Sequence, residues 1–197
     1  MAMFRMRVLA LALAFACGAA PAQPRLALPL TVVMIDGSGW TRERADAVLR
    51  EATGILEQCG VGLEHRDLVV LKVRSDLMDF STPAARELAR AYPVARPAVY
   101  LLRDTKSRPA FDAEAIGRGN SRTRPEIADT VWMTAASRDP GVVLAHELAH
   151  VLMDSGEHSD EERNLMREET SPRDKRLSAA QCARLRDTGK ANGLLGD

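Results

Sequence analysis

His146-Glu147-Leu148-Ala149-His150 is the stretch around which this 197-residue chain is organised. Residues four apart on an α-helix lie on one face, so a helix here would turn the imidazoles of His146 and His150 toward one point. Glu147 would lie one step round the same helix. His158 follows shortly afterwards, so three of the four histidines of the chain fall in one short segment.

This spacing is the H-E-x-x-H arrangement of zinc hydrolases. Neutral imidazole nitrogens are good ligands for Zn²⁺, and a catalytic zinc takes three protein ligands and leaves its fourth position to a water. Glu147 stands between two ligands and is poorly placed to be the third, but it can accept a proton from that water. The pattern predicts His146 and His150 as metal ligands and Glu147 as the general base, which later protonates the leaving amine.

The residues around the motif favour a buried helix. Asp139 is a typical N-cap residue, Pro140 suits the first helical position, and Gly156 is the kind of residue that ends a helix in a left-handed turn. Two histidines and a glutamate in a buried helix need polar partners, which a metal ion with its water supplies. The apolar residues that cover nearly the whole circumference are Val142, Val143, Leu144, Ala145, Leu148, Ala149, Val151 and Leu152.

The segment from His146 to Met166 resembles the metzincins, a clan of zinc endopeptidases that includes the matrixins and astacins. Those proteins read H-E-x-x-H-x-x-G-x-x-H: the glycine turns the chain so that a third histidine reaches the zinc, and a methionine turn follows. The resemblance makes Gly156 the turning residue, His158 the third ligand, and Asn164-Leu165-Met166 the methionine turn, with Met166 supporting the site. Over the rest of the chain the resemblance is loose.

The spacing after the motif differs from the metzincin pattern. His158 comes eight residues after His150 where the clan has six, and Gly156 comes six residues after His150 where the clan has three. We favour His158 as the third ligand, with a nearby carboxylate, or a downstream glutamate as in thermolysin-like enzymes, as the alternative. These carboxylates are Glu157, Asp160, Glu161, Glu162 and Glu168. The alternative for Met166 is an ordinary core residue, since methionine often fills gaps.

The first 22 residues have the pattern of an export signal. Two arginines form a positive start, residues 8–16 are apolar but too few to span a membrane, and Ala20-Pro21-Ala22 is a small-x-small cleavage site. The mature chain would be residues 23–197, one domain without a transmembrane segment, secreted or periplasmic. The alternative is a lipid anchor on Cys17, although the residue three before this cysteine is alanine rather than leucine.

Two cysteines remain in the mature chain, Cys59 and Cys182. In an oxidising compartment they suggest one disulfide, which would close a long loop and join the C-terminal segment to the N-terminal half. The alternative is a pair of buried free thiols.

Apolar runs and helical spacing predict the remaining elements. We expect strands at 28–35, 68–73, 98–102 and 130–134, and helices from Thr41 to Cys59, at 82–91, around the motif, and at 178–187. Thr41 is expected to cap the first helix, and Ser178 with Gln181 forms a capping-box pattern for the last. Residues 113–117 predict a short edge strand, to which the resemblance would assign substrate binding.

Strands that alternate with helices imply parallel pairing through right-handed crossovers. We therefore expect an α/β (α+β) fold: a single zincin-like domain with a mixed, mostly parallel twisted sheet, an active-site helix and a small C-terminal subdomain. His65 stands alone near an expected turn and is interpreted as a surface or supporting residue. Gly117-Arg118-Gly119 follows no convincing strand and opens no helix, so a phosphate-binding loop is rejected.

These patterns predict a zinc metalloendopeptidase that acts on a peptide or protein substrate. Lysine plus arginine equals aspartate plus glutamate, at 27 each, so no net charge favours nucleic acid or an anionic membrane. One alternative is a zinc-bearing binding or envelope protein without hydrolytic function, although a structural zinc needs no base such as Glu147. The other is an accidental motif in a structural envelope protein, which predicts no bound metal.

Overall fold

The computed structural model describes residues 25–104, 113–116 and 125–196. The elements in chain order are β1 (Leu26–Ile35), α1 (Arg42–Leu56), η1 (Glu57–Cys59), β2 (Val61–Leu71), η2 (Ser75–Leu77), α2 (Thr82–Ala91), β3 (Ala98–Leu102), β4 (Ala113–Ile116), η4 (Pro125–Ile127), β5 (Thr130–Thr134), α3 (Pro140–Met153) and α4 (Ala179–Ala191). The expected export signal with Cys17, and the Gly117-Arg118-Gly119 segment, lie outside the described residues.

The strands form one sheet in the order β2-β1-β3-β5-β4. β1 pairs in parallel with β2 and β3, and β3 pairs in parallel with β5. β4 pairs with β5 in the antiparallel direction and forms one edge of the sheet. The mostly parallel sheet with an antiparallel strand is therefore confirmed.

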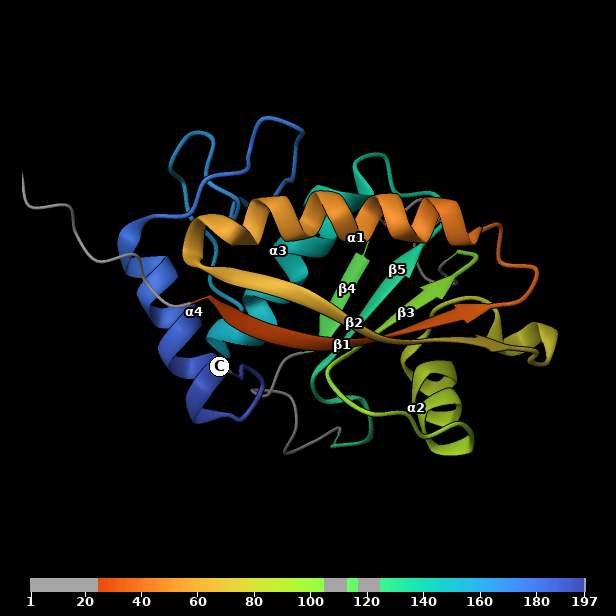
Figure 1. The fold of residues 1–197 in the computed structure, drawn as a ribbon. Helices are drawn as coiled ribbons and strands as arrows, with labels where there is room; N and C mark the ends of the chain where they lie inside the picture. Colours follow the sequence, from red (N-terminus) through yellow and green to blue (C-terminus); the bar gives the residue numbers. More distant parts are fainter. Residues whose placement is uncertain (1–24, 105–112, 117–124, 197) are drawn as a thin grey trace, which may run out of the picture.

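Helices cover both faces of this sheet (Figure 1). α1 and α3 pack on one face, and α4 lies beside α3 at one end of the molecule. Alternate side chains of the strands separate two cores: Val99 and Leu101 of β3 belong to the core with α1 and α3. Tyr100 and Leu102 belong to the core on the other face, with α2. β3 is thus buried on both sides, as a central parallel strand should be.

β2 is longer than the sequence pattern predicts. The expected strand at 68–73 is observed as Val61–Leu71, so it begins seven residues earlier and ends two residues earlier. β2 is the other edge of the sheet, where exposed polar residues such as Glu64 and Asp67 interrupt the apolar run that would signal a buried strand. His65 lies inside this strand, opposite Leu30, rather than near a turn.

The predicted caps of α1 and α4 are present. Thr41 Oγ1 accepts a hydrogen bond from the Arg44 N–H at 3.2 Å, and Ser178 and Gln181 form the predicted capping box. α4 runs to Ala191 rather than to residue 187. Gly189 lies near the end of α4 and packs against the residues that follow it and against α3, since a Cβ atom at this position would lie 2.7 Å from Leu195 Cδ1 and 3.1 Å from Leu152 Cδ2.

The predicted disulfide joins Cys59 to Cys182, with Cα atoms 4.9 Å apart. Cys59 ends the η1 turn after α1, and Cys182 lies in the first turn of α4. The bond therefore attaches the C-terminal helix to the first half of the chain. Among the described residues, no helix combines the length and the hydrophobicity needed to cross a membrane.

Replacement of both cysteines, Cys59→Ser with Cys182→Ser, should lower the free energy of unfolding by about 4 kcal/mol. A cross-link between residues 123 positions apart removes chain entropy from the unfolded state. Denaturation with urea, with a chelator present so that metal binding does not contribute, measures this difference. An unchanged free energy of unfolding would show that α4 is held in place without the disulfide.

Candidate metal centre

The predicted motif lies in α3, which packs between the sheet, α1 and α4. Pro140 occupies the first turn, as predicted. Asp139 stands at the N-cap position, and its carbonyl accepts the Val143 N–H at 3.0 Å. Its side chain makes no capping hydrogen bond, which corrects the expected role of its carboxylate. Proline at the first position lacks one of the N–H groups that the start of a helix leaves without an intrahelical partner.

The end of α3 differs from the prediction. The left-handed residue is Asp154, with φ 47°, and not Gly156. Aspartate tolerates this conformation better than most residues because its side chain is short and polar. The helix therefore ends three residues after His150, and the Ser155 N–H is donated back to the His150 carbonyl at 3.2 Å. After Ser155, two residues, Gly156 and Glu157, remain before His158.

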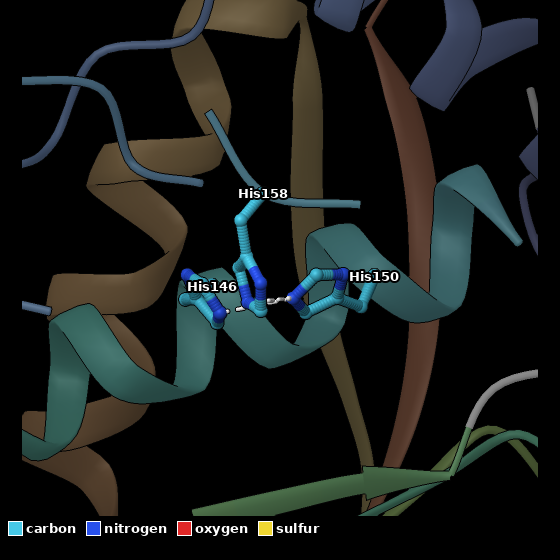
Figure 2. A group of neighbouring side chains, drawn as sticks. All are labelled: His146, His150 and His158. Carbon is cyan, nitrogen blue, oxygen red and sulfur yellow. Dashed lines mark hydrogen bonds between the residues drawn. The ribbon is translucent and has the colours of Figure 1, made fainter. Parts of the chain in front are cut away.

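The three histidines come together, as predicted (Figure 2). His150 Nε2 lies 2.9 Å from His146 Nε2 and 3.3 Å from His158 Nε2. The first two rings are buried within α3, whereas His158 is exposed and reaches the cluster from the following loop. The site is thus fixed on one side by the core and open to solvent on the other.

Backbone carbonyls determine which ring nitrogens face the centre of this cluster. His146 Nδ1 lies 2.7 Å from the Leu165 carbonyl oxygen, and His150 Nδ1 lies 2.6 Å from the Ser155 carbonyl oxygen. A carbonyl only accepts, so each Nδ1 carries the proton and donates it. In the neutral rings both Nε2 atoms then present lone pairs to each other, an arrangement that needs a cation between them.

The nitrogen–nitrogen distances of 2.9 and 3.3 Å are close to the spacing of ligands around a tetrahedral metal. Zinc–nitrogen bonds of about 2.0–2.1 Å place two ligand nitrogens about 3.3–3.4 Å apart. The described residues contain one group of this kind, His146, His150 and His158, with ligand atoms that all lie within 4.8 Å of one another. The five carboxylates considered as alternatives do not belong to it. Two of them are hydrogen-bonded elsewhere, Glu157 to Arg184 and Glu161 to Asn164.

Burial keeps the two histidines of α3 uncharged. Loss of solvation lowers the pKa of His150 to about 4, and the neighbouring His146 adds to this effect. Burial also lowers the pKa of His146, against the hydrogen bond to Leu165, which raises it. Both rings are therefore neutral near pH 7, which is the state in which imidazole binds a metal.

Met166 lies in a loop that contacts the site through its backbone. The side chain is buried, and the Met166 carbonyl accepts the Ser159 N–H at 2.7 Å, directly after His158. The preceding carbonyl, that of Leu165, is the partner of His146. Sequence patterns indicate Met166 but miss these carbonyls, because backbone acceptors leave no signal in residue types.

Glu147 occupies an unusual position in α3. From Gly141 to Met153 all residues of this helix are buried except Glu147, which is half-buried. The helix thus opens toward solvent at the residue that the motif predicts as the base. A carboxylate at such a position can exchange a proton with water or with a bound substrate.

Comparison with known proteins gives a likeness of fold only. No model of a known protein family matches the chain, and no curated protein sequence matches it. The crystal structure of metalloproteinase-II from Bacteroides fragilis is similar, with a TM-score of 0.61 and 19% sequence identity. The likeness covers 85% of this chain and 55% of that chain, so this chain spans little more than half of that protein. The similarity confirms the predicted fold class.

The substitution His158→Ala tests the third ligand. Loss of a residue that only supports a metal ligand typically weakens metal binding by about 10- to 100-fold. The substitution should weaken zinc binding by more than this, because it removes one of the three donor atoms. Competition against a coloured chelator measures the dissociation constant. Asp160→Ala, which removes a neighbouring exposed carboxylate, should bind zinc as the natural chain does. If Asp160→Ala weakened zinc binding and His158→Ala did not, Asp160 and not His158 would be the third ligand.

Proposed function

We propose that this chain is a zinc-dependent metallopeptidase that hydrolyses peptide bonds with Glu147 as the general base. The proposal is supported by three imidazoles whose ligand nitrogens lie together, and by Glu147, the one half-buried residue from Gly141 to Met153 of α3. His146, His150 and His158 would be the ligands. The exposed side of the cluster, at His158, is where a substrate could approach.

Each residue has a defined task in this reaction. A zinc ion held by the three histidines would lower the pKa of a bound water and polarise the carbonyl of the substrate. Glu147 takes a proton from the attacking water and delivers it to the leaving amine, which departs as a neutral group. The Leu165 and Ser155 carbonyls hold the rings of His146 and His150 so that Nε2 faces inward throughout.

An edge strand supports a peptide as substrate. β4 forms the antiparallel edge of the sheet and contacts α3, the helix that carries the motif. The outer side of an edge strand offers backbone groups to which an extended peptide can add as a further strand. We therefore assign substrate binding to β4. The name of the structural neighbour, a metalloproteinase, agrees with this class of substrate.

The proposed location is outside the cytoplasm, secreted or periplasmic. The pattern of residues 1–22 supports export. The Cys59–Cys182 disulfide supports an oxidising compartment, since such bonds are rare where thiols are kept reduced. A lipid anchor on Cys17 is the alternative within the same proposal.

The substitution Glu147→Gln should leave zinc bound but reduce peptide hydrolysis at least 100-fold, since a positioned general base contributes roughly 10²–10⁴ in rate. Digestion of a broad peptide library by the zinc-loaded chain, followed by mass spectrometry, measures hydrolysis, and elemental analysis measures zinc. Glu169→Gln makes the same chemical change at an exposed position and should leave hydrolysis unchanged.

The outcomes separate the possible functions. A Glu147→Gln variant with full activity would refute the assignment of the base. A natural chain that binds one zinc and cleaves no peptide in the library would instead favour a zinc-bearing binding or envelope protein. A chain without zinc would make the motif accidental.

A further inference from the structure

The loop that carries Met166 contains a buried amide side chain. Asn164 is 3% exposed. Its Nδ2 group donates to Glu161 Oε2 at 3.1 Å and to Gln181 Oε1 at 3.0 Å. Its Oδ1 atom accepts from Gln181 Nε2 at 3.2 Å and from the Met166 N–H at 2.9 Å. Both donors and both acceptor positions of the amide are therefore used, and its orientation is fixed.

Gln181 lies in the first turn of α4, where the capping box fixes its side chain. Its Oε1 atom accepts the Ser178 N–H at 2.8 Å, and its own N–H is donated to Ser178 Oγ at 3.2 Å. The next residue, Cys182, is bonded covalently to Cys59. Gln181 thus connects a fixed helix end to Asn164 through two hydrogen bonds in opposite directions.

Asn164 in turn fixes the peptide group on which His146 depends. Leu165 stands between Asn164 and Met166, and the Asn164 side chain binds the Met166 N–H. The Leu165 N–H is donated to the Arg176 carbonyl at 2.6 Å. With both flanking groups held, the Leu165 carbonyl points at His146 Nδ1. Rotation of the peptide group between Leu165 and Met166 would remove the carbonyl acceptor that keeps the proton on Nδ1 of His146.

We propose that Asn164 and Gln181 are positioning residues for the metal centre. Their reciprocal amide pair fixes the Leu165 carbonyl, and through it the tautomer and the direction of the His146 ring. Neither residue belongs to the group of possible metal ligands, and both would act through His146. The inference rests on the zinc site of the proposed function and does not require that the chain be a peptidase.

The chain offers well-matched variants for a test. Gln181→Ala removes both hydrogen bonds to Asn164. Gln181→Glu keeps the two acceptor roles, toward the Ser178 N–H and toward Asn164 Nδ2, but its second oxygen cannot donate and would face Asn164 Oδ1, another acceptor. Ser178→Ala weakens the same helix cap but leaves the bonds between Gln181 and Asn164 intact. Comparison of the three separates positioning of the ligand from loss of helix stability.

Two measurements should be made on the full chain with each variant. The first is the dissociation constant for zinc, from competition with a chelator; the second is the visible absorption spectrum of the Co²⁺-substituted chain, which reports the arrangement of the ligands. Gln181→Ala should bind zinc roughly tenfold more weakly, as for other outer partners of a ligand, with an altered Co²⁺ spectrum. Gln181→Glu should keep the helix cap and still bind zinc more weakly than the natural chain, because two acceptors then face each other at Asn164 Oδ1. Ser178→Ala should unfold more easily and bind zinc as the natural chain does.

Three results would overturn the inference. In the first, Gln181→Ala binds zinc as tightly as the natural chain and has the same Co²⁺ spectrum. In the second, Ser178→Ala weakens zinc binding as much as Gln181→Ala, so that the effect is one of helix stability. In the third, the natural chain binds no zinc, which refutes the proposed function and removes the basis of the inference. The first two leave the zinc site itself intact and refute only the positioning role.

Discussion

A buried imidazole must satisfy two ring nitrogens, and this requirement governs the region around His146 and His150. The hydrogen bonds from Nδ1 to the Leu165 and Ser155 carbonyls satisfy one nitrogen of each ring. They leave the two Nε2 atoms 2.9 Å apart, each with a lone pair directed at the other. Unpaired polar atoms in the protein interior are costly, and a cation between the two Nε2 atoms would remove this cost.

The rest of the fold can be understood as support for these two carbonyls. The Ser155 carbonyl is positioned by the left-handed turn at Asp154, which reverses the chain directly after α3. The Leu165 carbonyl is positioned by the loop that leads to α4, and the disulfide fixes α4 to the end of η1. The sheet and α1 bury α3, which lowers the pKa of both histidines and keeps them ready to bind a metal. Elements distant in the sequence thus serve one small site.

The sequence predicts the parts of this structure that depend on local patterns. β3 and β5 match the predicted ranges because both are apolar runs in the middle of the sheet. The three histidines could be foreseen because helical spacing fixes two of them. β2 was predicted too short because an edge strand carries polar residues. The turn after α3 was assigned to Gly156, since glycine is the usual left-handed residue, whereas Asp154 adopts that conformation. Partners of the histidines could not be predicted, because they are backbone atoms brought together by tertiary structure.

Anomalous diffraction at the zinc absorption edge, from crystals of the purified chain grown with zinc, would reveal whether the three imidazoles bind a metal. We expect one peak, about 2.0–2.1 Å from Nε2 of His146, His150 and His158. A peak bonded to carboxylates, or none in crystals grown with zinc, would contradict this expectation.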